Sequence, residues 1–257
     1  MSESNNVDND SDNVDTAGLE ARRTRDGRLL ADTALAHIRK LIATAALGPG
    51  DRVNEVEIAS QLGISRGPVR EAIRRLASSG LVVSAPNLGS RVVQLDVPSI
   101  RALYEVREAL ESMSAGLAAK RMDASERVAL QQMLDEHAAI MREKGSSTYP
   151  TGTSDWDFHL AIVNGSRNEV AWRICGNDLR DLLSLLRGRH GRRPGRGERA
   201  LLEHQWIADA VIAGNADLAS MLMAQHIRAS RDNLLMMINP SGRDKDKKEF
   251  ADDHEVA

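Results

Sequence analysis

The sequence predicts a mainly α-helical protein of two domains. A small N-terminal domain of helices is closed by a β-hairpin, and an all-α antiparallel helical bundle follows it. Three observations predict this arrangement. Apolar residues recur with helical spacing at positions 66–78, and valine-rich runs at 81–83 and 91–93 flank a turn. From about residue 97 to residue 240 the apolar pattern is helical throughout.

Composition sets limits on the class of protein. The 257 residues are enough for two domains, and with 3% aromatic residues the cores must be built from aliphatic side chains. The formal net charge of −3 means that any affinity for nucleic acid must come from a local basic surface. A single cysteine, Cys175, excludes an intramolecular disulfide. No apolar run approaches about 18 residues and none follows Met1, so we expect a cytoplasmic protein without a membrane partner.

Both ends of the chain are expected to lie outside the folded domains. Residues 1–28 begin with an Asn-, Asp- and Ser-rich stretch, and they are predicted to form a disordered tail. Four arginines at positions 22–28 could contact DNA as a basic arm does, or could belong to a solvated linker. Residues 241–257 are a second charged, disordered tail. The two domains are then expected at 29–95 and 96–240.

The helix that begins after Ser65 has two faces of different chemistry. Apolar residues recur at i, i+4 and i+7 on one face, and arginines recur at i, i+4 and i+8 on another. The apolar set is Val69, Ile73 and Leu76, and the basic set is Arg66, Arg70 and Arg74. The apolar face is expected to pack inward, so three guanidinium groups point away from the core together.

The residues on either side of this helix complete a recognisable motif. A short helical pattern lies upstream and ends in the turn Gly63-Ile64, and Ser65 is placed to cap the second helix. Helix, turn and capped helix with a basic outer face form the layout of a helix-turn-helix, whose second helix enters the DNA major groove. Turn residues 86–89 join two short strands, and this hairpin is expected to be a wing.

Residues 30–95 resemble the winged helix-turn-helix domain of the GntR family of bacterial transcription regulators. The matching residues are Gly50-Asp51-Arg52-Val53, Ile58-Ala59, Leu62-Gly63-Ile64-Ser65-Arg66, Pro68-Val69-Arg70-Glu71-Ala72, Leu76, Gly80-Leu81-Val82, Asn87 and Gly89. The resemblance implies a double-stranded DNA operator as partner. The residues expected at the DNA are Ser65, Arg66, Gly67, Arg70, Arg74, Asn87 and Gly89. Val56 stands where the family often carries a basic or polar DNA contact, which puts that contact in doubt.

The second domain is predicted to contain a series of amphipathic helices. They are expected at 97–121, about 123–141, 155–164, 168–188, 197–213 and 216–237. The apolar stripe of the first is Ile100, Leu103, Val106, Leu110, Met113 and Leu117. Short connections between helices predict an antiparallel bundle with room for a pocket. Whether the bundle has six or seven helices is left open.

Four polar residues stand on the apolar faces of these helices. Asp155 and His159 are one turn apart, while His204 and His226 lie on two later helices. A lone histidine on such a face is usually a hydrogen-bonded core residue. Burying three of them with an acid is costly unless they share a cation. Nitrogen and oxygen donors without thiolate favour Zn, Ni, Mn or Fe.

This second segment resembles the FCD ligand-binding domain of the FadR subgroup of GntR regulators. The matching residues are Arg107, Glu111, Asp155, Phe158, His159, Asn168, Glu203, His204, Ala210, Gly214, Ala219 and His226. The resemblance implies a divalent metal, with zinc first, held by Asp155, His159, His204 and His226. It leaves coordination positions for a small carboxylate effector, for which Arg107 is a second contact. Arg107 could equally pair with Asp155 or Glu111.

These expectations combine into one hypothesis with two rivals. The hypothesis is a homodimeric transcription regulator that reads an inverted-repeat operator and responds to a small organic acid bound near the metal. The first rival is a metal sensor in which the cation itself is the effector. The second is a metalloenzyme with a DNA-binding appendage, in which the metal activates water. The sequence offers no obvious general base for that chemistry, and the first hypothesis is therefore favoured.

Overall fold

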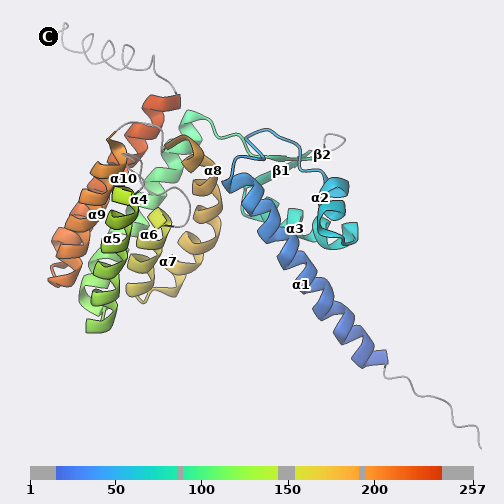
Figure 1. Cartoon of the computed structure of the whole chain (residues 1–257), viewed down its shortest axis with the longest axis horizontal. Coiled ribbons are helices and arrows are strands. Elements are labelled where there is room, and N and C mark those ends of the chain that lie inside the picture. The colour runs from blue at the N-terminus through green and yellow to red at the C-terminus, as the bar shows by residue number, and fades with distance from the viewer. Residues whose placement is uncertain (1–15, 86–88, 144–153, 191–194, 239–257) are drawn as a thin grey trace, which may run out of the picture.

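The structure is a computed structural model that describes residues 16–85, 89–143, 154–190 and 195–238. Its two domains are visible as separate bodies in Figure 1. The N-terminal domain, called here the wing domain, contains α1 Thr16–Ala43, α2 Glu55–Leu62, α3 Arg66–Ser78, β1 Val82–Ala85 and β2 Gly89–Val92. The bundle contains α4 Val97–Arg121, α5 Ala124–Glu143, α6 Ser154–Gly165, α7 Glu169–Arg173, the π-helical segment η1 Ile174–Leu179, α8 Arg180–His190, α9 Arg196–Ile212 and α10 Ala216–Ile238.

Local sequence signals explain the elements of the wing domain. Asn54 caps α2. Its side-chain oxygen accepts hydrogen bonds from the backbone N–H groups of Val56 and Glu57, which have no acceptor within the helix. Gly63 ends α2 in the left-handed region at φ 65°, which glycine adopts without a Cβ clash. The two strands pair antiparallel, from Val82 opposite Val92 to the turn. The predicted helix-turn-helix and hairpin are therefore both present.

One boundary differs from the expectation for the N-terminal tail. Residues 16–28 were expected to be disordered, but the structure places them in α1, which runs from Thr16 to Ala43. Arginine occurs four times and alanine twice in this stretch, and both are strong helix formers. They extend the helix backward from the segment that is anchored in the core from Ala31 onward. Residues 1–15 and 241–257 lie outside the described residues.

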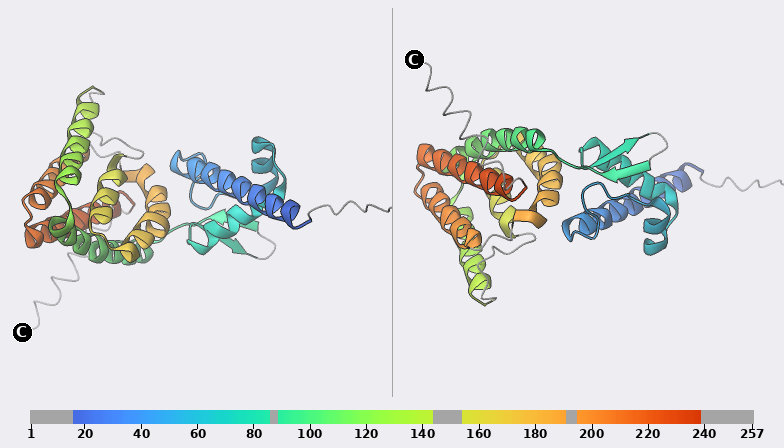
Figure 2. Two further views of the ribbon diagram at one scale, coloured as in Figure 1. Left: turned by 90° about the horizontal axis from the view of Figure 1, so that it is seen from below. Right: turned by 90° about the horizontal axis from the view of Figure 1, so that it is seen from above.

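The bundle packs α4 against α10 at its centre, as the views in Figure 2 show. At Gly116 of α4 a Cβ would overlap the Ser220 Oγ of α10, so glycine permits the close approach of the two helices. The largest buried side chains of this core include Tyr104, Phe158 and Met223. In the described ranges, no helix combines the length and the apolar character that crossing a membrane requires.

Arg127 of α5 ties three helices together. Its guanidinium donates hydrogen bonds to the carbonyl oxygens of Ala119 at 2.9 Å and Met122 at 3.2 Å, at the end of α4. It also donates to the carbonyl of Ile212, the last residue of α9. The final carbonyls of a helix have no partner within the helix, so one side chain satisfies two helix ends.

The buried face of α4 differs from the predicted apolar stripe. Val106 and Met113 belong to that stripe, but they are 49% and 40% exposed. The face turned inward instead carries Tyr104, Arg107 and Glu111, which are almost completely buried. Apolar periodicity identifies the inward face of a helix only when that face is apolar. In α4 the inward face lines a polar centre.

The predicted helix at 168–188 is a continuous helical run with a change of register. Asn168 caps α7 by accepting hydrogen bonds from the Val170 and Ala171 backbone N–H groups, so its role is structural. η1 then inserts a π-helical turn before α8 begins at Arg180. Such turns widen the helix locally and often lie beside functional sites. Cys175 is fully buried in η1, and this burial raises the pKa of its thiol to about 12.

Replacing Arg127 with methionine should lower the free energy of unfolding by about 2–3 kcal/mol. The substitution keeps an unbranched side chain but leaves helix-end carbonyls without their charged donor. Urea denaturation followed by circular dichroism measures the loss. Arg101→Met at an exposed position of α4 is the matched control and should change stability little. Equal stabilities of the two variants would contradict the role assigned to Arg127.

Candidate DNA-binding surface and candidate metal centre

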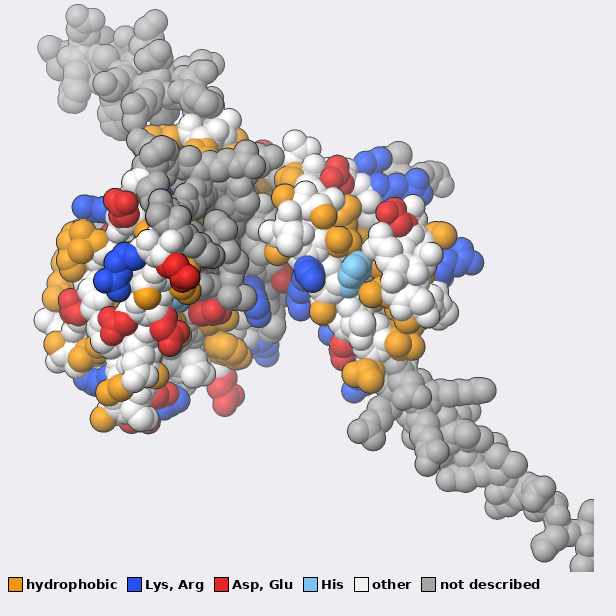
Figure 3. All heavy atoms as spheres, in the orientation of Figure 1, with side chains coloured by type: hydrophobic (Ala, Val, Ile, Leu, Met, Phe, Trp, Pro, Cys, Tyr) orange, Lys and Arg blue, Asp and Glu red, His pale blue; other side chains and the backbone are white. Residues whose placement is uncertain are grey.

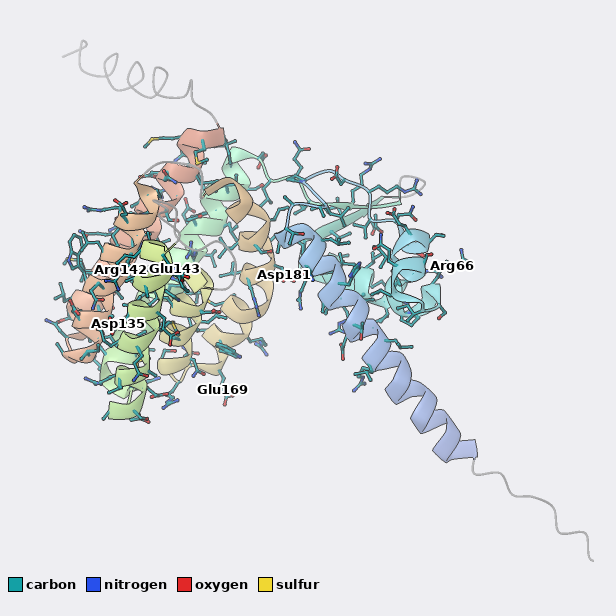
Figure 4. The ribbon with its side chains drawn as sticks, viewed as in Figure 1. Arg66, Asp135, Arg142, Glu143, Glu169 and Asp181 are labelled. Atoms are coloured by element: carbon teal, nitrogen blue, oxygen red, sulfur yellow. The ribbon has the colours of Figure 1, made fainter. Side chains whose placement is uncertain are left out.

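The helix predicted to read DNA presents its arginines to solvent. Val69 and Leu76 of α3 are 0% exposed, whereas Arg66 and Arg70 are on the exposed side of the same helix. Figure 4 shows Arg66 at the outer end of the wing domain, away from the bundle. Ser65 occupies the N-cap position as expected, although its side chain makes no capping hydrogen bond. The inward and outward faces are those that the sequence predicts.

Two of these arginines have acidic partners within the domain. Arg70 Nε lies 3.3 Å from Oε2 of Glu55 in α2, and Arg74 Nη1 lies 3.1 Å from Oε2 of Glu71. The arginine side chains remain 57% and 69% exposed, so these ion pairs are weak and can exchange for other anions. Gly67 has no neighbour closer than 3.9 Å to an added Cβ, and its small size lets a DNA backbone approach α3.

The wing adds basic side chains on the same end of the domain. Gly89 opens β2 at φ 73°, in the left-handed region expected of a turn glycine, while Asn87 lies outside the described residues. Arg52 and Arg91 are exposed at the base of the wing, where they form an isolated β-bridge. Figure 3 shows Lys and Arg side chains on this outer end. The site prediction omitted Arg52 and Arg91, although Gly50-Asp51-Arg52-Val53 already belonged to the matched motif.

Three histidines from three helices meet inside the bundle. They are His159 of α6, His204 of α9 and His226 of α10, and each is at most 4% exposed. One ligand atom from each lies within 4.8 Å of the other two. His204 also stacks on Phe158, with ring centroids 4.2 Å apart. Asp155 lies one turn before His159 in α6, but its side chain is outside the description.

Two carboxylates orient these imidazole rings. Glu111 Oε2 lies 2.5 Å from His159 Nδ1, and Glu203 Oε2 lies 2.8 Å from His226 Nδ1. A carboxylate at Nδ1 favours a proton on that nitrogen and directs the Nε2 lone pair to the other side of the ring. The Nε2 atoms of His204 and His226 lie 3.2 Å apart in the centre. The sequence analysis did not assign Glu203 this role, although it is adjacent to His204.

The charges in this centre are balanced. Burial acts to raise the pKa of Glu111, but the adjacent Arg107 and His159 outweigh it and hold that pKa at about 2. The pKa of Glu203 is also about 2, because its contacts with His226, Arg196 and Arg199 outweigh its burial. Burial lowers the pKa of His226 to about 4, against the opposing effect of Glu203. His226 is therefore neutral at pH 7, which is the form that binds metals.

Arg107 connects the charge network to the histidines. Its Nε donates to Glu111 Oε1 at 2.6 Å, so the pairing with Glu111 that the sequence left open is present. Its Nη2 lies 3.2 Å from His159 Nε2 at the centre. The guanidinium is 4% exposed and therefore faces the interior. A cation on His159 Nε2 requires Nη2 to move aside, which would turn this donor toward any anion beside the cation.

The donor set fits a divalent transition metal. One nitrogen from each of three buried imidazoles lies within 4.8 Å of the other two, and two of the rings have the carboxylate on Nδ1 that is typical of metal-ligating histidines. Nitrogen ligands of this kind suit zinc, nickel or iron. Soft metals instead prefer sites built from thiolates. Three ligands would leave further positions for an acid such as Asp155, for water or for an anion.

The fold and its surfaces define a class of protein. A winged helix-turn-helix with exposed arginines, joined to a helical domain with a buried polar centre, is the architecture of a DNA-binding transcription regulator. Residues 30–92 match the family described as "Bacterial regulatory proteins, gntR family", and residues 102–229 match the family described as "FCD domain". The chain belongs to the GntR family of transcription regulators and carries an FCD domain.

Known proteins with similar sequences are regulators of the same kind. The probable D-xylose utilization operon transcriptional repressor of Paenarthrobacter nicotinovorans is 30% identical over 211 residues, which cover 79% of this chain and 89% of that protein. The HTH-type transcriptional repressor RspR of Escherichia coli is 27% identical over 192 residues, 74% of this chain and 82% of that one. The family and these relatives are regulators rather than enzymes, which decides against the metalloenzyme rival.

Solved structures share the fold. Escherichia coli McbR/YncC superposes with a TM-score of 0.71 at 21% identity and covers 82% of this chain and 99% of its own. A GntR-type regulator from Rhodococcus sp. RHA1 gives a TM-score of 0.64 at 24% identity, with 80% and 97% covered. The two-domain architecture is therefore that of known GntR structures.

Arg66→Ala and Arg70→Ala should each weaken binding to a specific operator by about 1–3 kcal/mol if they contact base edges. Guanidinium groups can form two hydrogen bonds to a guanine edge, and alanine removes both. Fluorescence anisotropy with an operator selected in vitro measures the loss. Arg142→Ala, an exposed arginine of α5 in the bundle, is the control and should bind as wild type. Unchanged affinity of both α3 variants would exclude α3 as the reader.

Proposed function

We propose that this regulator binds a small organic acid beside a divalent metal ion in the bundle, and that this changes its affinity for an inverted-repeat operator. The observation that carries the proposal is the meeting of three buried histidines from three helices inside the bundle, two of them with a carboxylate on Nδ1. Imidazole nitrogens from three helices that face one point are the donors a divalent cation takes, and the cation would bind them together. Operators are on the chromosome, which places this action in the cytoplasm.

The metal would be held by His159, His204 and His226, with Asp155 as the predicted fourth ligand. Zinc is the first choice, and nickel, manganese and iron are the alternatives. When bound, the ion supplies a Lewis-acidic position that attracts an anionic oxygen. Glu111 and Glu203 keep two of the rings oriented, so the protein does not have to order them when the ion binds.

Arg107 is the side chain best placed to recognise the carboxylate of an effector. Its Nη2 already faces the centre, and Glu111 holds the guanidinium in place by accepting a hydrogen bond from Nε. A guanidinium can donate two parallel hydrogen bonds to a carboxylate, which selects planar organic acids over simple halides. Binding of the acid would then add a negative charge between Arg107 and the metal.

The second candidate function is a pure metal sensor, and the ion pair of Arg107 favours it. Arg107 is buried in an ion pair with Glu111, so its charge is balanced without an added anion. In that case metal binding alone would change the operator affinity. The two candidates differ in one measurement, which is operator affinity in the metal-loaded protein with and without a carboxylate such as acetate.

We also propose that two copies of the chain form a homodimer through α4 and α10. Met113 and Val106 of α4 are 40% and 49% exposed, and Leu218 and Met221 of α10 are 37% and 50% exposed. The two helices run antiparallel, so Met113 and Met221 lie at the same level. A second copy is the occupant that fits this surface, because one recognition helix reads one half-site and an inverted repeat requires two.

Purified protein should contain about one transition-metal ion per chain, and His204→Ala should lose it. At a free zinc concentration about 100 times Kd, loading should stabilise the wild type by about 3 kcal/mol, because metal binds only the folded state. Elemental analysis and thermal melts before and after chelation measure both effects. His37→Ala, at an exposed histidine of the wing domain, is the control and should retain the metal.

One result would contradict the proposed metal site. If the wild type holds no metal after supplementation, and a chelator leaves its melting curve unchanged, the three histidines are ordinary core residues.

Replacing Met221 with glutamate should convert the dimer to a monomer at micromolar concentration. The change places two charges at a surface that the dimer would bury, and an unpaired buried charge costs several kcal/mol. Light scattering measures the mass. Val128→Glu, at an equally exposed position of α5, is the control and should remain dimeric. A monomeric wild type would reject the dimer, and a dimeric Met221→Glu would reject this interface.

A further inference from the structure

The two domains are in direct contact through α1 and α8. Arg39 of α1 donates from both Nε and Nη2 to Asp181 Oδ2, at 3.0 and 2.7 Å. The Asp181 side chain is 4% exposed, whereas that of Arg39 is 41% exposed. Figure 4 shows Asp181 on the edge of the bundle that faces the wing domain. One carboxylate of the bundle is therefore buried against a helix of the other domain.

Apolar contacts continue this connection one turn further along α8. Leu185 is 7% exposed, and it belongs to the hydrophobic core of the wing domain together with Ile38 and Ile42 of α1. Leu182 packs against the same core as a partly buried side chain. α8 is thus a bundle helix whose apolar side chains complete the core of its neighbour.

The other end of the same helical run reaches the polar centre. α8 continues directly from η1, and η1 packs against both α4 and α6. These two helices carry Arg107, Glu111 and His159. η1 is therefore in direct contact with both helices, where a shift of α4 or α6 would act on it. α8 moves with η1, because the two share one backbone run.

We propose that α8 is a latch that fixes the orientation of the wing domain on the bundle. The latch consists of Asp181, Leu182 and Leu185 of α8, with Arg39 of α1 as its ionic partner. When η1 shifts, the latch opens or closes, and the wing domain gains or loses freedom to rotate. This role concerns the contact between domains and does not require a metal. It explains how a change deep in the bundle reaches a recognition helix in another domain.

The latch can be tested by reversing its charges. Arg39→Asp and Asp181→Arg each place like charges together and should open it, while the double variant restores an opposite pair. Hydrogen exchange of residues 180–186 measures opening, and we expect at least tenfold faster exchange in each single variant. The double variant should return close to wild type. Asp32→Asn is the matched control, because Asp32 forms an ion pair with Arg75 at 2.7 Å inside the wing domain.

The effect on DNA is measured with an operator selected in vitro by the wild-type protein. Inserting one base pair between its half-sites should weaken wild-type binding, because the latched wing domains fit one spacing. In the single variants this preference should fall at least threefold, while the affinity for an isolated half-site stays unchanged. Asp181→Asn keeps the shape of the side chain and introduces no new charge. It should show both the faster exchange of residues 180–186 and the smaller spacing preference.

Two results would overturn the proposal. If Arg39→Asp and Asp181→Asn leave both the exchange of α8 and the spacing preference unchanged, α8 does not fix the wing domain. If the double charge reversal fails to recover the wild-type exchange, the ion pair is not the part that holds the latch.

Discussion

The burial of charge inside the bundle is the constraint on which the rest of this structure depends. Glu111, Arg107 and three imidazoles are buried in the bundle, so each must be satisfied by a neighbouring polar group, and Glu203 at the edge of this centre connects His226 to Arg196 and Arg199. This requirement fixes which faces of α4, α6, α9 and α10 point inward.

The wing domain could be predicted closely from the sequence because its signals are local. Val69 and Leu76 face inward, Gly63 makes the turn, and the valine runs form the hairpin. Each of these depends on residues a few positions apart. The start of α1 at Thr16 differs from the prediction, because residues 16–28 show no apolar periodicity in the sequence and composition alone does not separate such a helix from a disordered tail.

The metal candidates were found because histidines stand out on apolar stripes, but their supporting residues were not. Glu203 and Glu111 hold His226 and His159 by contacts between helices far apart in sequence, which no spacing rule reveals. The same long-range packing turned Val106 and Met113 outward and made the face with Arg107 the inner one. Contact between α8 and α1 is of this kind as well, since residues 39 and 181 are brought together only by the domain arrangement.

The acidic partners of the α3 arginines bear on how this protein searches a chromosome. Arg70 and Arg74 already interact with Glu55 and Glu71, so any phosphate that attracts them must first replace a carboxylate. A random stretch of DNA offers little more than charge, and much of its attraction is cancelled by this exchange. A guanine edge offers two aligned acceptors and more than compensates. In the DNA-reading role that we propose for α3, weak pairs of this kind would lower residence on the wrong sequences by a small factor and so shorten the search without adding a contact at the right one.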